Sequence, residues 1–331
     1  MLRVALMLYG TMNTHKFIYD NSSFMPIGRI LNALRNSGQI DYRAFIYTED
    51  KAFFKWTPQE FFVGNKVHDY PILEWVEDRY CVAQCDENEL LQDFERIYGE
   101  CLGKVIILKD AFDRNKWNSS SDDYRKPNTS NRWRNTMITT FFEKKKKVFT
   151  LCQDYQREKG MNFDVFILAR PDSSFYLKTH VDASERNNLK LLESSLLNDI
   201  EKLVGAEKNT IYVDKALYDN SFSQKQGFNK GLIKNDLIFA KEHTMQIHVG
   251  FYDKIIEETR GNYFSLYPEV AYRCSNCFHI EPNQKTKTCR QCKKPDTLQN
   301  ISEWPEYKMF EHLQRYSLSI HNSLISGKVI R

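Results

Sequence analysis

The sequence predicts an α/β protein with a mostly parallel central sheet flanked by helices and a small cysteine-rich segment near the C-terminus. Three observations indicate this architecture. Short apolar runs such as Val165 to Ala169 have the length and residue types of buried strands. Helical patterns separate these runs, as in β-α-β units. Two Cys-x-x-Cys pairs stand close together after residue 270.

Length and charge narrow the class of protein. The chain has 331 residues, of which 41% are hydrophobic and 14% aromatic, as in a globular protein with a large core. Lysine and arginine number 47 against 43 acidic residues, a net charge of +4. This excess is too small to indicate a nucleic acid partner, whereas phosphate-bearing small ligands remain compatible with it.

The opening residues do not form a convincing signal peptide. Met1 to Phe17 has a short apolar core and no cleavage site of small residues, and nowhere do about 18 apolar residues run together. We therefore expect a soluble, cytoplasmic protein with no transmembrane segment. In that compartment cysteines are thiols or metal ligands rather than disulfides.

The chain opens with a β-α-β unit. Arg3 to Tyr9 is an apolar strand that breaks at Gly10. A helical pattern then runs from Pro26 to Gly38, and Tyr42 to Thr48 is the second strand. Such a unit builds a parallel sheet whose strand ends bind ligands.

The later elements alternate in the same way. Asn115 to Asn131 is rich in Ser, Asn, Asp and Lys and has no periodicity, so we expect a loop there, either a lid or a plain insertion. The other predicted elements are helices Glu87 to Leu102, Trp133 to Lys159, Leu189 to Leu203, His243 to Glu258 and Pro305 to Ser319, and strands Lys104 to Asp110, Asn209 to Lys215 and Leu237 to Ala240.

The strand that ends at Ala169 runs directly into Arg170, Pro171 and Asp172. Proline has no N–H group and cannot continue a central strand, so Pro171 ends the strand where its charged neighbours emerge. Sheets of this class bind ligands at that edge. Arg170 and Asp172 are therefore a candidate ligand site, with an ion pair that caps the strand end as the structural alternative.

The clustered cysteines have the spacing of a zinc ribbon. Eleven residues separate Cys274 and Cys277 from Cys289 and Cys292. Two such pairs complete a tetrahedral zinc site with no open position, which predicts a structural role; iron or a redox dithiol is the alternative. The surrounding basic residues allow nucleic acid or protein binding, or the ribbon clips the C-terminal helix onto the body.

The order of these elements resembles the nucleotide-sugar-dependent glycosyltransferases of the GT-A fold. The resemblance rests on the strand that ends in Tyr9 and Gly10, the helix that feeds FDVFILARPDSSFY, the segment NDLIFAKEHTMQIHVGFYD, and YPE at Tyr267 to Glu269. It implies a GT-A-like domain over residues 1–272. The cysteine spacing predicts the zinc ribbon inserted at 273–300, and we expect a C-terminal helix at 301–331 that packs on the body. Such proteins occur in polysaccharide and glycoprotein gene clusters of bacteria and of large DNA viruses.

The resemblance assigns the donor site. Arg170-Pro171-Asp172 matches the acidic motif that holds Mn²⁺ or Mg²⁺ against the donor diphosphate, although it has one carboxylate instead of two. Arg170 can bind the diphosphate as well. The turn at Tyr9, Gly10 and Thr11 would receive the base and ribose. Two further arginines, beside the predicted loop, would close over the diphosphate or belong to an ordinary helix start: Arg132 and Arg134.

The acceptor side carries two candidate bases. Asp236 precedes an apolar run and would take the proton of a sugar hydroxyl in an inverting mechanism, or it caps the next turn. Glu269 is the second candidate, and a retaining route stays open.

Together these features predict transfer of a sugar from a nucleoside-diphosphate sugar to a hydroxyl of a glycan or glycoconjugate. The alternatives are a zinc-ribbon protein that binds nucleic acid or protein, and a nucleotide-sugar-binding module without turnover.

Overall fold

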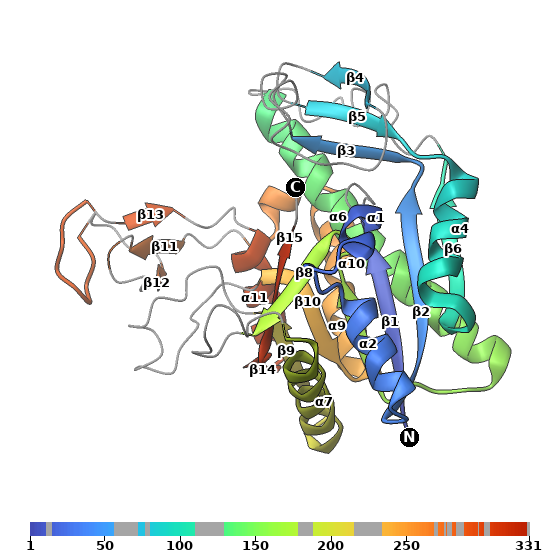
Figure 1. Cartoon of the computed structure of the whole chain (residues 1–331). Helices are drawn as coiled ribbons and strands as arrows, with labels where there is room; N and C mark the ends of the chain where they lie inside the picture. Colours follow the sequence, from blue (N-terminus) through green and yellow to red (C-terminus); the bar gives the residue numbers. More distant parts are fainter. Residues whose placement is uncertain are drawn as a thin grey trace.

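A computed structural model describes residues 1–10, 15–55, 72–76, 80–109, 129–177, 188–214, 234–267, 271–274, 276, 280–282, 288–296, 298–300 and 305–329. Its centre is a seven-stranded sheet in the order β14-β9-β10-β7-β1-β2-β6 (Figure 1). Neighbouring strands are parallel except where β10 meets β7 and β9. The strands are β1 Leu2–Tyr9, β2 Ile40–Glu49, β6 Leu102–Leu108, β7 Val165–Ala169, β9 Thr210–Asp214, β10 Lys234–Ala240 and β14 Ser319–Asn322. The predicted α/β class with a mostly parallel sheet is confirmed.

Strand β1 is buried on both faces and pairs on both edges. Its side chains alternate, so that Val4, Leu6 and Leu8 join one apolar cluster. Ala5, Met7 and Tyr9 join the other cluster, on the opposite face. A fully buried aliphatic side chain contributes about 1.5–3 kcal/mol of stability, so this continuous apolar run fixes β1 as the central strand.

Helices cover both faces of the sheet. Apolar stripes on one set of helices pack into the cluster that contains Val4: α2 Ile27–Asn36, α4 Glu87–Tyr98 and α7 Leu189–Gly205. A second set packs into the cluster that contains Tyr9: α6 Thr129–Lys159, α9 Glu242–Val249, α10 Phe251–Thr259 and α11 Pro305–Arg315. The result is a three-layer α/β/α arrangement.

Three small sheets and three short helices complete the described fold. One sheet has the order β3-β5-β4 and lies beyond the carboxyl ends of β1 and β2 (Figure 1). Its strands are β3 Lys51–Lys55, β5 Tyr80–Gln84 and β4 Ile72–Val76. The others pair β8 Ser173–Leu177 with β15 Ile325–Val329, and β11 Ala271–Cys274 with β12 Ile280–Pro282 and β13 Leu298–Asn300. The short helices are α1 His15–Asp20, η2 Gly99–Cys101 and η4 Tyr263–Ser265.

Several predicted boundaries need correction. The single helix expected over His243 to Glu258 is wrong, because the chain forms α9 and α10 with a break at Gly250. Phe251, the first residue of α10, is fully buried, so α10 begins with a large side chain in the core. The predicted helix Glu87 to Leu102 ends as α-helix at Tyr98, and Gly99 there has φ 51°.

The C-terminal segment differs most from expectation. The helix expected over Pro305 to Ser319 ends at Arg315, and two unpredicted strands follow, β14 and β15. Their connection is held by Asp199 of α7, which is 1% exposed and whose Oδ2 accepts from the Ser323 hydroxyl at 2.7 Å and from the Leu324 N–H at 2.8 Å. This anchor lies more than a hundred residues away in sequence, which explains why local patterns did not indicate the two strands.

Gly28 allows α2 to approach two tyrosines. A Cβ on this residue would overlap the Tyr19 hydroxyl and lie 2.8 Å from Cε1 of Tyr98. The two tyrosine hydroxyls are hydrogen-bonded to each other at 2.9 Å, so neither ring is free to turn aside.

We expect Gly28→Ala to destabilise the protein by about 1–3 kcal/mol, because the added methyl forces this packed tyrosine pair apart. Urea unfolding measures the change. Gly205→Ala is the matched control, since Gly205 ends α7 with nothing within 4 Å of a Cβ. Equal stability of the Gly28 variant and the wild type would contradict this account of the contact.

His312 joins α11 to two other segments. Its Nε2–H donates to the Ile247 carbonyl at 2.8 Å, and its Nδ1 accepts from the Tyr267 hydroxyl at 2.8 Å. Burial lowers the pKa of His312 from 6.5 to about 4, so the ring is neutral in the folded protein. The unfolded chain therefore binds a proton below pH 6.5 that the folded protein binds only near pH 4.

The stability contributed by neutral His312 is present above pH 6.5 and is lost as the pH falls towards 4. Between pH 7 and 5 this one group accounts for about 2 kcal/mol of the loss in unfolding free energy. The variant His312→Gln keeps a hydrogen-bond donor and an acceptor but does not titrate. We expect its unfolding free energy, measured by urea titration, to fall by about 2 kcal/mol less than that of the wild type between pH 7 and 5. Identical pH dependence in both proteins would rule out the assignment, since the buried His15 and His248 contribute to both alike.

Candidate functional site

The carboxyl edge of the sheet brings the predicted ligand residues together. The chain passes from β1 to β2 and β6 on one side and then returns to β7 on the other side of β1. The carboxyl ends of β1 and β7 therefore flank the point where the strand order reverses, which is where open α/β sheets bind ligands. Gly10 follows β1 there, and Arg170 follows β7.

Arg170 and Asp172 form a bidentate ion pair at this edge. Arg170 Nε donates to Asp172 Oδ1 at 2.9 Å, and Nη2 donates to Oδ2 at 2.6 Å. The side chain of Asp172 is only 2% exposed, and that of Arg170 is 18% exposed. The carboxylate thus lies inside the protein with both oxygens engaged, whereas the guanidinium is the partner nearer to solvent.

Gly10 has the conformation that a close ligand contact needs. Its φ of +115° is one that other residues rarely adopt, and among the described residues no atom outside its chain neighbours lies within 4 Å of a Cβ placed on it. Thr48, at the end of the neighbouring strand β2, donates its hydroxyl to the Gly10 carbonyl at 2.8 Å. The backbone at the end of β1 is therefore tied to the end of β2.

The antiparallel strand β10 begins at the same edge. Leu237 pairs with Ala169 of β7, so the backbone of Asp236 lies beside the exit to Arg170. On its other side Lys234 pairs with Asp214, the last residue of β9. The structure thus places the backbone of Asp236 next to the exit of β7 towards Arg170.

Asp214 is a buried carboxylate at this edge that the sequence reading did not select. It is fully buried and accepts a hydrogen bond from the Ser326 hydroxyl of β15. A polar residue at the end of the apolar run TIYVD was the available signal, the same signal that identified Asp172. Because β15 pairs with β8, which follows Asp172 directly, the C-terminal strand supports both carboxylates.

The remaining predicted residues are less defined. Thr11 and Glu269 lie outside the described residues. Arg132 and Arg134 belong to the first turns of α6, whose backbone alone is described there. In Figure 1 this end of α6 lies towards β3 and β5, at the carboxyl edge of the sheet.

A buried cation lies behind the end of β1. Lys145 of α6 is fully buried, with its Nζ 5.3 Å from the ring centre of Tyr9 and 4.6 Å from that of Phe141. Its neighbour Lys144 pairs with Glu49, the last residue of β2, at 2.8 Å. Cation–π contacts stabilise a buried ammonium, so α6 brings positive charge close to the candidate site.

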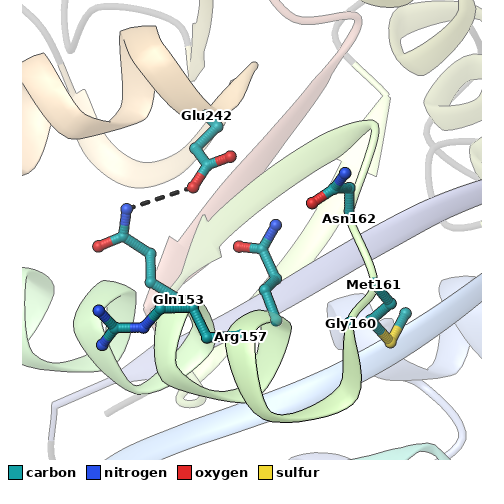
Figure 2. Close-up of a pocket in the computed structure, with 7 residues that line it drawn as sticks. Gln153, Arg157, Gly160, Met161, Asn162 and Glu242 are labelled. Carbon is teal, nitrogen blue, oxygen red and sulfur yellow. Dashed lines mark hydrogen bonds between the residues drawn. The ribbon is translucent and has the colours of Figure 1, made fainter.

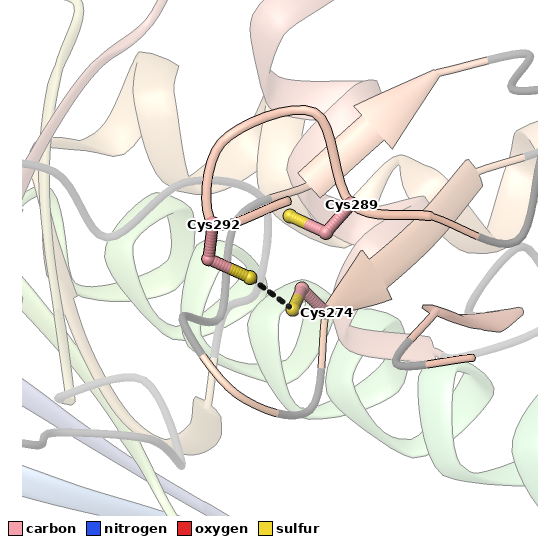
Figure 3. A group of neighbouring side chains, drawn as sticks. All are labelled: Cys274, Cys289 and Cys292. Carbon is pink, nitrogen blue, oxygen red and sulfur yellow. Dashed lines mark hydrogen bonds between the residues drawn. The ribbon is translucent and has the colours of Figure 1, made fainter. Parts of the chain in front are cut away.

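Three of the four clustered cysteines meet in space. The sulfur atoms of Cys274, Cys289 and Cys292 all lie within 4.8 Å of one another, with Cys274 and Cys292 at 3.6 Å (Figure 3). The Asn276 N–H donates to the Cys274 sulfur at 3.4 Å, a contact that favours a thiolate. Cys277 lies outside the described residues. These three thiols are close enough to hold one metal ion.

The cysteines belong to a separate part of the fold. Strands β12-β11-β13 form their own antiparallel sheet, which lies to one side of the central sheet (Figure 1). Arg290, Lys293 and Lys294 are exposed beside the cluster. We call residues 271–300 the cysteine module.

A pocket of about 310 Å³ lies at the opposite edge of the central sheet (Figure 2). It is formed where α6 ends and where α9 begins, and Gln153 donates there to Glu242 at 3.2 Å. The lining residues are Gln153, Gln156, Arg157, Gly160, Met161, Asn162 and Glu242. No residue predicted from the sequence lines this pocket, so it is distinct from the candidate site.

Comparisons of the chain with protein-family models, with curated proteins and with solved structures find no match. Within the described part of the chain, no helix combines the length and the apolar character needed to cross a membrane.

Proposed function

We propose that the chain is a glycosyltransferase of the GT-A type that transfers a sugar from a nucleoside-diphosphate sugar to a hydroxyl of a glycan or glycoconjugate. The observation that carries the proposal is the juxtaposition at one sheet edge of Gly10, the Arg170–Asp172 pair and the backbone of Asp236. A diphosphate needs a cation beside it, and an attacking hydroxyl needs a base. This edge offers residues of both types on adjacent strands.

In this proposal the donor lies across the ends of β1 and β7. Tyr9, Gly10 and Thr11 receive the base and ribose, since a glycine lets the backbone approach a ligand closely. Arg170 neutralises the charge that builds on the departing diphosphate. Two further arginines close over the diphosphate from the start of α6: Arg132 and Arg134.

Chemistry then takes place at the anomeric carbon. Asp236 accepts the proton of the acceptor hydroxyl, and the oxygen of that hydroxyl forms the new bond to the anomeric carbon. The bond between carbon and diphosphate oxygen breaks, and the nucleoside diphosphate leaves with the electron pair. Glu269 is the second candidate for the base, and a retaining route remains the alternative.

The Mn²⁺ or Mg²⁺ that the resemblance implies does not fit Asp172 as it is arranged. Both of its oxygens accept from Arg170, and its side chain is 2% exposed. Among the described residues, the cysteines form the only group of three or more His, Cys, Asp or Glu side chains with metal-binding spacing. No step above is therefore routed through a divalent cation.

Asp236→Asn tests the assignment of the base. We expect turnover, measured as nucleoside diphosphate released from the donor in the presence of acceptor, to fall by about 10²–10⁴-fold, because proton transfer is lost. Calorimetric titration with UDP, GDP and their sugar conjugates should give affinities within about twofold of the wild type. Unchanged turnover contradicts the base assignment, and absence of binding to any nucleotide contradicts the proposed function.

In the proposed architecture the cysteine module is a structural zinc ribbon. Cys274, Cys289 and Cys292 would supply three thiolates, and Cys277 the fourth. With four sulfur ligands the ion has no open position, so its contribution is to fold a segment too small to bury an apolar core.

We expect about one zinc per chain by elemental analysis of protein purified without chelator. Cys289→Ser should lower the zinc content by more than half, because a hydroxyl is a poor ligand for this ion. Cys152→Ala is the control, as Cys152 is buried in α6. Full zinc content in the Cys289 variant, or none in the wild type, would contradict the ribbon.

A second candidate function is binding of nucleic acid or an acidic protein through the cysteine module. The exposed Arg290, Lys293 and Lys294 favour it. Such binding would weaken steeply with salt and would be unaffected by Asp172→Asn, which separates it from the transferase.

A further inference from the structure

The geometry of the Arg170–Asp172 pair assigns its two members different roles. Asp172 accepts two N–H groups in parallel, from Nε and Nη2, at 2.9 and 2.6 Å. A guanidinium carries five N–H groups in one plane, so this contact uses two of them and fixes the direction of the others. The buried Asp172 therefore orients the guanidinium of the more exposed Arg170.

The position of the pair restricts what Asp172 can contact. A divalent Mn²⁺ or Mg²⁺ ion takes six or more oxygen ligands, several of them waters. Asp172 is 1% exposed, so a hydrated ion reaches its oxygens only after Arg170 has been displaced. Breaking a buried charge pair is strongly unfavourable, because one charge stays buried without its partner.

The same position suits Arg170 for an anion. Its planar fork matches two oxygens of a phosphate group, which a lysine ammonium does not. Pro171 restricts the backbone between the pair, and the backbone of Gly10 lies at the adjoining strand end. A phosphate between these strand ends meets a guanidinium whose orientation is already fixed.

We infer that Arg170 binds the phosphate groups of the ligand directly, that Asp172 is a positioning residue, and that binding requires no divalent cation. The identity of the ligand as a nucleoside-diphosphate sugar rests on the proposed function, whereas the anion site rests on the geometry of the pair. Inorganic pyrophosphate, which has no nucleoside and no sugar, tests the two separately.

The experiment is calorimetric titration of the full chain with pyrophosphate and with UDP and GDP, in buffer freed of divalent ions by a chelating resin and again with added Mn²⁺. We expect pyrophosphate to bind in the metal-free buffer and Mn²⁺ to change the affinity less than threefold. Arg170→Lys should weaken binding by about tenfold or more, since the fork is lost while the charge is kept.

A double-mutant cycle distinguishes positioning from a purely structural role. Asp172→Asn should weaken metal-free binding several-fold, and the double variant should bind no worse than Arg170→Lys alone, because Asp172 acts only through Arg170. Arg43→Lys and Asp41→Asn form the matched control, an Arg–Asp pair of the same spacing at 2.9 Å near the start of β2. Thermal unfolding of each variant verifies folding, and Arg170→Gln replaces Arg170→Lys if that variant unfolds.

Binding that appears only with Mn²⁺, or additive losses in the cycle, would overturn the inference. Absence of pyrophosphate binding in both buffers would overturn it as well. Arg170-dependent pyrophosphate binding without binding of any nucleotide would uphold the anion site and reject the proposed function.

Discussion

The placement of strand β1 is the constraint on which the rest of the structure depends. Residues Val4 to Tyr9 are fully buried, and β1 pairs in parallel with β2 on one edge and β7 on the other. A strand covered on both faces and both edges has a single register that satisfies its backbone groups and its side chains. That register sets Gly10 beside the exit of β7, and the reversal of strand order at β1 creates the candidate site.

The fold class was predictable because its signals are local. Buried strands are continuous apolar runs, and the apolar stripe of α2 repeats at helical spacing. The sequence therefore predicted β1, β2, β7, α2, α4 and α6 within a few residues, whereas α1 was missed. Strands β8, β14 and β15 were missed because their partners are remote in sequence, as with Ser326 and Asp214. The break at Gly250 was missed because the burial of Phe251, which accompanies it, cannot be read from the helical pattern.

The candidate site was predictable in part for the same reason. Apolar runs that end at a glycine or at charged residues indicated Gly10, Arg170 and Asp172, and the sheet brings these strand ends together. Their contacts could not be read from the sequence, because the bidentate contact with Arg170 and the 2% exposure of the Asp172 side chain arise only in the folded chain. The GT-A resemblance and the boundaries of the three predicted regions stay predictions.

The cysteine module and the carboxyl edge are two separate features of one chain. They are linked through α11, which follows the module and packs against α9 through His312 and Ile247 before the chain returns to the sheet as β14 and β15. Helix α11 thus lies in the chain between the module and the strand that supports Asp214.

The most direct test of the account is a crystal structure of the protein with the nucleoside diphosphate that binds it. The account predicts a diphosphate at the carboxyl ends of β1 and β7, with its oxygens on the Arg170 guanidinium and its nucleoside along Gly10. A ligand bound instead in the pocket beside Glu242 or on the cysteine module, with the carboxyl edge empty, would contradict it.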